Sequence, residues 1–263
     1  MRVLTTCFRC VWGPDLDHTT NRSQEELLAA HNAATQYVRV VAEPVSVVNC
    51  EKGHRFVLFV QDLGHAMLFE RALFHLVDGN ARDAVLDGYT ALEMFLALVP
   101  VRARYDREKG AKISAIRSEL APALKTSDRA MASAMATVSL LTGKAPPSIP
   151  NALSEARNQA VHQGKSPALA KAEEHLVTIA NVVGAFEDAL DSQQCVNDPP
   201  FDSALAFTSV EELYQRDATA QGLKVASTSL ATALAAHKIT GVREPLQERI
   251  KRLKNGEALL TLR

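Results

Sequence analysis

Residues 151–164 read Asn-Ala-Leu-Ser-Glu-Ala-Arg-Asn-Gln-Ala-Val-His-Gln-Gly, and this stretch decides how the middle of the chain is interpreted. Gly164 is the residue type that most often ends a helix, so we expect a helix that stops there. Arg157, Asn158 and His162 lie near the end of that helix. A general base beside a fixed cation suits phosphodiester chemistry on RNA, where a hydroxyl must lose a proton and a phosphate must be held.

The spacing of these three residues determines which of them can meet. At about 100° per residue, Asn158 and His162 lie on one helix face, one turn apart, whereas Arg157 and His162 are about 140° apart. The last two converge only through the long arginine side chain or across an interface with a second copy of the helix. A two-fold homodimer would bring both patches face to face into one composite site. The alternative is ordinary capping on a solvated helix end.

This pattern resembles the signature of the HEPN domain superfamily, in which Arg-Asn-x-x-x-His lies on a helix. The order of the flanking segments fits as well. They resemble the early long helix with its Ala-Leu-Glu core, the Leu-Leu-x-Gly turn before the motif helix, and the closing helix, at 83–97, 136–150 and 165–190, respectively. The resemblance covers roughly residues 66–192 and implies a helical bundle.

The same resemblance implies an activity and a setting. Many members are endoribonucleases that use no catalytic metal and act in toxin–antitoxin or phage-defence systems, with RNA as substrate and an antitoxin or defence protein as partner. His162 would take the proton from a ribose 2′-OH, Arg157 would stabilise the charge that develops on the phosphate, and Asn158 would orient it. The product would carry a 2′,3′-cyclic phosphate. Other members are catalytically silent and bind a nucleotide or a protein partner, which is the alternative function.

Further residues are candidates for supporting roles. Glu93 lies on the expected long helix among apolar residues, with Tyr89 four positions earlier on the same face. Both could steady Arg157 or His162, or Glu93 could instead form a helix-to-helix ion pair without a catalytic role. The stretches 102–129 and 238–263 each carry four more basic than acidic residues, so either could guide an RNA backbone. The candidates for RNA contact are Arg102, Arg104 and Lys165.

Cysteine and histidine near the N-terminus have the spacing of metal ligands. Cys7 and Cys10 form a Cys-x-x-Cys pair, and Cys50 is followed by His54 after a turn that Gly53 can make. We therefore predict a structural zinc site with these four ligands, which closes the coordination sphere and leaves no open position for catalysis. Strands are expected beside both turns, at 2–6, 44–49 and 55–61.

Zinc has alternatives in the same segment. About forty residues separate the two pairs of ligands, and 23–37 inside this gap reads as a helix with Ser23 as its N-cap. His18 and His31 are rival ligands without the spacing of a knuckle, and the thiols could also be unligated. A thioredoxin-like redox site is disfavoured because no βαβ pattern follows Cys-x-x-Cys.

Composition sets the class of the protein. The chain has 263 residues, 47% hydrophobic and 5% aromatic residues, and a formal net charge of −1, which argues against a general nucleic-acid coat. The sequence shows no uninterrupted apolar run of about 20 residues and no convincing signal peptide. We therefore expect a cytoplasmic protein with an aliphatic core and no membrane partner.

The expected architecture is mainly α. A zinc-ribbon-like module with a helical insertion occupies 1–62, a HEPN-type helical bundle 63–192, and a helical extension 193–263. Pro100 is expected to kink or end the long helix of the bundle. The segment 192–200 resembles a linker or a domain edge. The expected helices are 66–78, 81–100, 111–124, 127–142, 167–192, 208–237 and 242–254.

Overall fold

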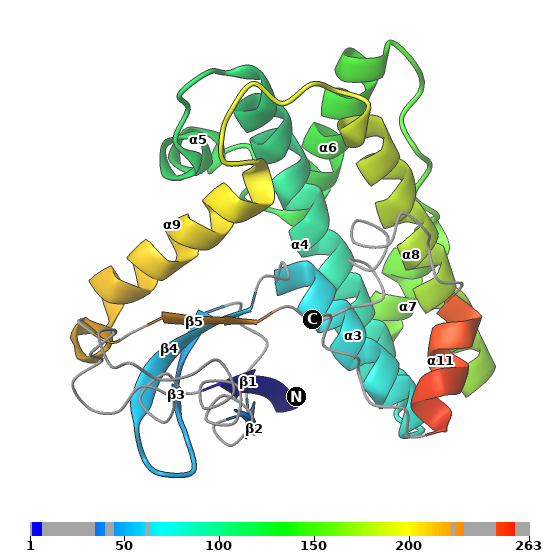
Figure 1. Ribbon diagram of the computed structural model, residues 1–263. Helices are drawn as coiled ribbons and strands as arrows, with labels where there is room; N and C mark the ends of the chain where they lie inside the picture. Colours follow the sequence, from blue (N-terminus) through cyan, green and yellow to red (C-terminus); the bar gives the residue numbers. More distant parts are fainter. Residues whose placement is uncertain are drawn as a thin grey trace, which may run out of the picture. The chain divides into compact units, whose positions relative to one another are not determined.

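The structure is a computed structural model in which most of the chain is placed (Figure 1). The residues it describes are 2–6, 35–39, 45–60, 64–221, 223, 225–228 and 246–255. Two compact units divide the chain. The first consists of Met1–Leu63, Ala206–Leu230 and Leu260–Arg263, and the second of Gly64–Leu205 and Ala231–Leu259. The final stretch, 193–263, is therefore shared between the two units rather than forming a unit of its own.

The first unit contains the strands. β1 (Arg2–Thr6) pairs antiparallel with β2 (Thr35–Arg39). β3 (Val45–Asn49) and β4 (Arg55–Val60) form an antiparallel hairpin, and β5 (Val225–Thr228) adds to β4 in parallel. Val45 and Val57 pack with Leu213 and Ala220 into a small core, so the sheet is covered by residues from far along the chain.

Two helical expectations differ from the structure over part of their length. The expected helix 23–37 overlaps β2, and only 35–37 of it lies within the described residues. The expected helix 208–237 is in fact α9, which spans Phe201–Arg216, followed by a 3₁₀ turn and then by β5. Both strands contain β-branched residues, and cross-strand pairing outweighs the weak helical preference of their neighbours.

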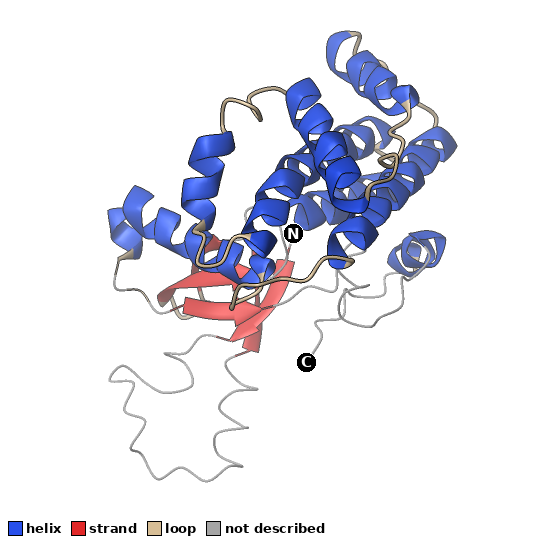
Figure 2. Ribbon diagram, turned by 90° about the horizontal axis from the view of Figure 1, so that it is seen from above, coloured by secondary structure: helices blue, strands red, loops and turns tan. Residues whose placement is uncertain are grey.

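The second unit is mainly helical, in agreement with the expected fold class. Its long helix α4 (Ala81–Arg107) packs against α3, α5, α6, α7 and α8, which surround it in Figures 1 and 2. The other helices of this unit are α3 (Gly64–Val77), α5 (Ile113–Leu120), α6 (Ser127–Thr142), α7 (Asn151–His162), α8 (Leu169–Asp191) and α11 (Leu246–Lys254). The helices expected at 66–78, 127–142 and 167–192 are thus confirmed to within two residues at each end.

Pro100 was expected to kink or end the long helix, and the structure shows that it does not end it. α4 continues through this residue to Arg107, and Val99, Pro100 and Val101 are all buried. Proline removes one backbone donor and crowds the preceding turn, but burial of apolar side chains on both sides of it favours continuation. This extension carries Arg102 and Arg104 on the same helix as Tyr89 and Glu93.

The apolar character of α4 has a structural explanation. The helix is long enough and apolar enough to cross a membrane, with a mean hydropathy of 1.5 over its best window, but 61% of that window is buried inside the protein. A helix surrounded by five others needs apolar residues on most of its circumference. Its composition is therefore that of the core helix of a bundle.

Gly88 allows α8 to approach α4 closely. A Cβ atom at this position would lie 2.3 Å from Leu176 Cδ2, 3.4 Å from Ile179 Cδ1 and 3.8 Å from Ala72 Cβ. Leu176 and Ala72 are completely buried, so neither has free space into which it can move. The packing of three helices therefore depends on the missing side chain of one residue.

We predict that Gly88→Val lowers the free energy of unfolding by about 1–3 kcal/mol, because the added methyl groups must displace Leu176 within a filled core. Urea denaturation followed by circular dichroism measures the change. Ala132→Val on the exposed side of α6 is the matched control, and its cost should stay near 0.5 kcal/mol. Equal losses in the two variants would contradict close packing at Gly88.

A buried ion pair attaches α11 to α3. Arg249 Nε and Nη2 both donate to Glu70 Oε1, at 3.2 and 2.7 Å, and their side chains are 4% and 0% exposed. Leu246 and Ile250 on the same helix are also buried. Removing one partner of a charged pair that is buried away from solvent is costly, because the other charge remains buried without a counter-charge.

We expect Arg249→Met to destabilise the protein by about 3–5 kcal/mol, since the Glu70 carboxylate would remain buried without its cation. The double variant Glu70→Leu/Arg249→Met removes both charges and should recover most of this loss. Thermal and urea unfolding of the two variants gives the comparison. If the single variant loses less than about 1 kcal/mol, the pair is solvated rather than buried.

Candidate functional site

The helix that carries the Arg-Asn-x-x-x-His motif is α7, and both of its ends are explained by the sequence. A segment containing three prolines precedes it, and Pro150 is its N-cap residue. The helix ends at His162, and Gly164 follows with φ +62°. Gln163 N and Lys165 N both donate to Gln159 O, at 3.1 and 3.2 Å. The expected stop is therefore confirmed, because only glycine adopts this left-handed conformation without strain.

One face of α7 packs against α4. Leu153 and Ala160 are 2% and 0% exposed. Arg82 on α4 donates from Nε to Ala160 O at 3.0 Å, which satisfies a carbonyl in the last turn of α7. Arg157 lies four residues after Leu153 and three before Ala160, so it shares their face and is half-buried.

The other two residues of the motif lie on a different side of the helix. Asn158 and His162 are exposed, and on a helical wheel His162 is about 140° from Arg157 and about 180° from Leu153. Arg157 Nη1 donates to Asn158 Oδ1 at 3.2 Å. Within one chain, therefore, Arg157 is directed towards α4 and His162 towards solvent, and the two do not form a common cleft.

α4 contributes Tyr89 and Glu93 beside this face. Tyr89 is 6% exposed. Burial raises the pKa of its hydroxyl, the neighbouring Glu93 carboxylate raises it further, and the Arg157 guanidinium acts in the opposite direction. Ser127 Oγ donates to Glu93 Oε1 at 2.5 Å. The structure thus brings Tyr89, Glu93 and Arg157 into one electrostatic environment at the meeting of α4, α6 and α7.

The arginines expected to contact RNA are already engaged by carboxylates. Arg102 pairs with Asp106 at 3.3 Å and with Asp191, and its side chain is 16% exposed. Arg104 pairs with Glu108 at 2.8 Å and with Glu119 at 2.5 Å. To contact RNA, each arginine would have to give up an ion pair with a carboxylate and bind a phosphate instead. Lys165 is exposed next to Gly164, just after the end of the motif helix, and no carboxylate among the described residues forms an ion pair with it.

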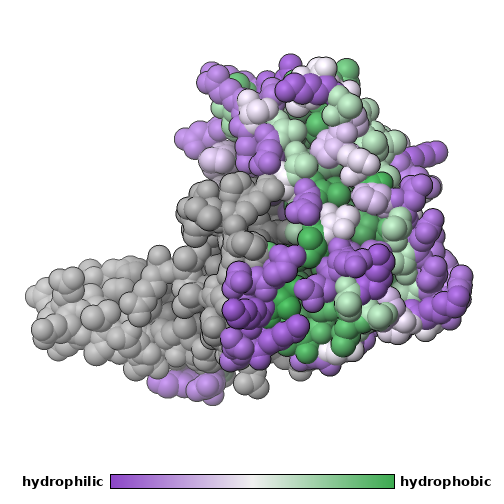
Figure 3. Space-filling view, turned by 90° about the vertical axis from the view of Figure 1, so that its right-hand side faces the viewer, coloured by the Kyte–Doolittle hydropathy of each residue, from purple (hydrophilic) through white to green (hydrophobic). Residues whose placement is uncertain are grey.

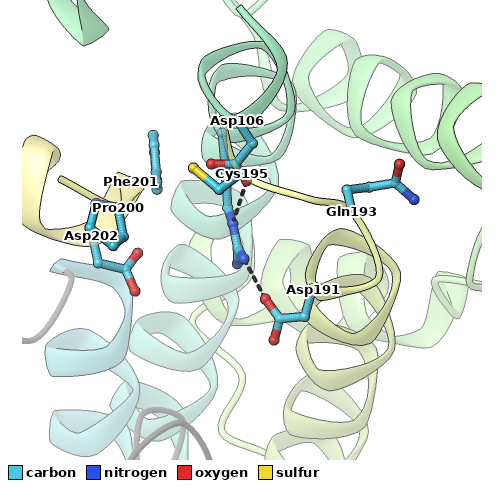
Figure 4. Close-up of a pocket in the computed structure, with 8 residues that line it drawn as sticks. Asp106, Asp191, Gln193, Cys195, Pro200, Phe201 and Asp202 are labelled. Atoms are coloured by element: carbon cyan, nitrogen blue, oxygen red, sulfur yellow. Dashed lines mark hydrogen bonds and ion pairs between the residues drawn. The ribbon is translucent and has the colours of Figure 1, made fainter. Parts of the chain in front are cut away.

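Sequence reasoning missed a cavity of about 290 Å³ at the C-terminal end of α4 (Figure 4). Arg102 lies in it between Asp106 and Asp191, and the Cys195 thiol and Asp202 also line it. Burial raises the pKa of the Cys195 thiol, which keeps it in its less reactive protonated form. The only signal in the sequence is the Asp-Pro-Pro turn that precedes Phe201.

The segment 192–200, expected to be a linker or a domain edge, is hydrogen-bonded to the end of α4. The Asn197 amide donates to Tyr105 O and to Glu108 O, and Asn197 Oδ1 accepts from Gly110 N at 2.8 Å. Val196 N donates to Asp106 O at 2.8 Å, and Tyr105 Oη donates to Pro199 O at 2.7 Å. These bonds explain how a turn rich in proline encloses the cavity.

Two of the four predicted zinc ligands lie within the described residues. Cys50 and His54 flank the tight turn between β3 and β4, where Cys50 N donates to His54 O at 3.0 Å and Gly53 N to Cys50 O at 2.8 Å. Gly53 has φ +78°, as the predicted turn requires. Cys7 and Cys10 lie outside the described residues. Among the described ones, no group of three or more His, Cys, Asp or Glu side chains could hold a metal.

No protein-family model, curated protein or solved structure matches this chain. Its function is therefore inferred from the chemistry of the side chains described above.

Proposed function

We propose that this protein is a metal-independent endoribonuclease of the HEPN type, whose site is completed by a second copy of α7. The observation that supports this is the placement of the motif at an exposed, glycine-capped helix end. There a half-buried arginine is hydrogen-bonded to the side chain of Asn158, and the imidazole of His162 is exposed to a partner. Arg157 and His162 lie on different sides of α7 and cannot reach the same phosphate within one chain. A second copy of α7 would supply the other member of the pair.

The chemistry follows from the properties of the three side chains. His162 accepts the proton from a ribose 2′-OH, and the resulting alkoxide attacks the adjacent phosphorus while the 5′-oxygen leaves. Arg157 donates from its planar guanidinium to the phosphate oxygens, whose negative charge grows in the transition state. Asn158 orients the phosphate or the opposite protomer. The 5′-oxygen takes up a proton from water as it leaves, and His162 later releases to water the proton that it accepted. The other product carries a 2′,3′-cyclic phosphate.

An interface around α7 has apolar side chains available to it. Val161, next to His162, is 42% exposed, and Leu169 at the start of α8 is 47% exposed. Figure 3 shows apolar surface intermixed with polar surface on the side of the second unit that carries α8 and α11. Such intermixing is typical of an interface with a modest apolar centre and a polar rim.

The setting of the proposed activity is a toxin or phage-defence system in the cytoplasm, with RNA as substrate and an antitoxin or defence protein as partner. Unrestrained cutting of cellular RNA would stop growth. The simplest first indication is therefore growth arrest on induced expression of the intact protein, but not of the His162→Ala variant.

We predict that purified protein cleaves single-stranded RNA in the presence of EDTA and leaves 2′,3′-cyclic phosphate ends. His162→Ala and Arg157→Ala should each lower the rate at least a hundredfold, because they remove the base and the cation that stabilises the phosphate. Denaturing gels of a labelled RNA measure the rate, and phosphatase treatment with and without acid identifies the ends.

Gln159→Ala is the matched control, since Gln159 is exposed on the same helix but outside the motif. It should retain the activity of the unmodified protein. The proposal is overturned if no RNA class is cut under any salt or pH tested, or if the His162→Ala variant cuts as fast as the control.

A silent binding protein is the second candidate function, and one observation favours it. Arg157 and His162 lie on different sides of α7, and Arg102 and Arg104 are occupied by carboxylates. A surface of this kind could bind a nucleotide or a protein partner through Asn158, His162 and Lys165 without cutting anything. Binding of RNA or nucleotide without any cleavage would favour this function.

We also propose a structural zinc ion in the first unit. Cys50 and His54 fit this role because a hydrogen-bonded turn holds them at neighbouring positions, and Cys7 and Cys10 would supply the other two ligands. A four-ligand zinc ion would stabilise a unit whose core is small. It takes no part in the proposed reaction.

Mass spectrometry under native conditions should find one zinc ion per chain. Cys7→Ser and Cys50→Ser should each abolish binding and lower the melting temperature, because each removes one of four ligands. Cys195→Ser is the control, since Cys195 lies in the second unit, and it should leave both values unchanged. Protein that contains no zinc after purification in zinc-supplemented medium would exclude the site.

A further inference from the structure

The C-terminal end of α7 meets the first turn of α4, and cations from two different segments lie there. We propose that Arg82 and Lys165 bind phosphate groups of a single-stranded RNA, so that its backbone passes over this end of α7. The inference rests on the proposed function. It names the surface that holds the substrate at the end of the helix that carries His162, not a group that reacts.

Arg82 is held against α7 by a hydrogen bond to a neutral group. Its Nε donates to Ala160 O at 3.0 Å, and Ala160 is completely buried. This carbonyl belongs to the last turn of α7, where carbonyls need partners from outside the helix. Among the described residues no carboxylate forms an ion pair with Arg82, and its two Nη groups form no hydrogen bond. The side chain is therefore fixed on one edge while its charge remains uncompensated.

Lys165 is brought to the same end of α7 by the turn at Gly164. Its backbone N donates to Gln159 O at 3.2 Å, the carbonyl directly before the one that Arg82 binds. Carbonyls of one helical turn point along the same axial direction, so the two residues are anchored at neighbouring points of the helix end. The Lys165 side chain is exposed, and no carboxylate in the described part of the chain pairs with it.

The helix ends themselves contribute little net charge at this place. Gly88 faces Leu176 in the first half of α4, and Arg102 pairs with Asp191 near its end, so α8 runs parallel to α4. α8 therefore begins at the same end of the bundle where α7 ends. A helix N-terminus carries about half a positive charge and a C-terminus about half a negative one, so the two nearly cancel. The full charges of Arg82 and Lys165 then determine the local potential.

Two carboxylates at this end of the bundle are engaged by other side chains. Asp83, which follows Arg82, accepts a hydrogen bond from Asn80 Nδ2 at 2.6 Å. Glu174 in the first half of α8 pairs with Lys171 at 2.5 Å. The two arginines at the opposite end of α4, Arg102 and Arg104, each pair with two carboxylates. The end that carries Arg82 is therefore the better place for a phosphate.

Phosphate is the group that these two cations suit. A planar guanidinium fixed on one edge directs its remaining N–H groups in a defined direction, which favours a tetrahedral oxyanion, and the lysine ammonium adds a point charge that can follow the backbone. Contacts of this kind bind the RNA backbone and do not distinguish bases. We therefore expect the surface to hold RNA regardless of its sequence.

The experiment measures binding without cleavage. A fluorescein-labelled 2′-O-methyl RNA of mixed sequence has no 2′-hydroxyl to attack and stays intact, and fluorescence anisotropy gives its affinity for the full-length protein between about 50 and 200 mM salt. Arg82→Gln and Lys165→Gln should each weaken binding roughly threefold to tenfold. Each should also make the slope of log affinity against log salt concentration shallower by about 0.7, because one phosphate contact is lost.

Two further variants separate the charge of Arg82 from its hydrogen bond. Arg82→Lys keeps the positive charge but loses the Nε that binds Ala160 O, so it should keep the salt slope of the unmodified protein. Arg129→Gln is the matched control, because Arg129 on α6 is exposed and likewise donates to a backbone carbonyl, Pro122 O at 3.3 Å. It should bind RNA as the unmodified protein does. Circular dichroism establishes that each variant is folded.

The proposal is overturned if the unmodified protein binds no RNA at any salt concentration, or if either Gln variant keeps the original slope. It is also overturned if Arg82→Lys loses as much affinity as Arg82→Gln, since the hydrogen bond would then be what matters. Lys165 is exposed, so Lys165→Gln keeps the test valid even where Arg82→Gln lowers the melting temperature.

Kinetics on cleavable RNA separate this inference from the function on which it rests. Arg82→Gln and Lys165→Gln should raise KM severalfold with kcat nearly constant, because contacts to phosphates that do not react are equally strong in the ground state and the transition state. Cleavage with unchanged KM in both variants overturns the surface while the function stands. Loss of salt-dependent binding in the two variants of a protein that cuts no RNA supports the surface and refutes only the function.

Discussion

The close approach of α8 to α4 at Gly88 is the constraint on which the second unit depends. Leu176 occupies the space where any other residue would place its Cβ, and Ala72 of α3 borders the same spot. Because protein interiors are close-packed, a wider separation there would open voids along both helices. α8 and α3 can therefore both lie close to this turn of α4 because Gly88 has no side chain.

The packing of α7 against α4 determines which of its functional side chains are buried and which are exposed. A helix of twelve residues is marginal by itself and is stabilised by what it packs against. Two buried side chains, Leu153 and Ala160, and one hydrogen bond from Arg82 determine which face of α7 points inward. That choice places Arg157 on the side of α7 that faces α4 and leaves His162 in solvent. Rotation of the helix by about half a turn would exchange their environments, so packing rather than motif spacing decides which of the two side chains is half-buried and which is exposed.

The sequence predicts the helices better than it predicts which strands and side chains pair with one another. Helix 127–142 follows from Thr126 as a cap and Gly143 as a stop, both of which act locally. β2 and β5 could not be found in this way, because their strands exist through partners about thirty and about one hundred and seventy residues away. Pro100 does not end α4 for a related reason: its local penalty is real, but burial of Val99, Pro100 and Val101 favours continuation of the helix. The pairs Arg102–Asp191 and Arg104–Glu119 depend on α8 and α5 and are likewise invisible in the sequence. The other two carboxylates, Asp106 and Glu108, lie four residues after these arginines and could be found from the spacing.

The different environments of Arg157 and His162 on α7 indicate what would decide whether the site binds RNA or cleaves it. The Arg157 guanidinium is half-buried and donates to Asn158 Oδ1, so it is restricted before any substrate arrives, which lowers the entropic cost of holding a phosphate. An exposed imidazole has no such restriction and gains a fixed orientation only from whatever covers it. If a second copy of the chain covers it, an ordered cation and an ordered base face the same phosphodiester, and cleavage follows. If a different protein covers it, the same cation binds phosphate without a base in reach, and the site binds without cutting. Whether this protein would be a nuclease or a silent binding protein thus depends on which partner covers the His162 side of α7.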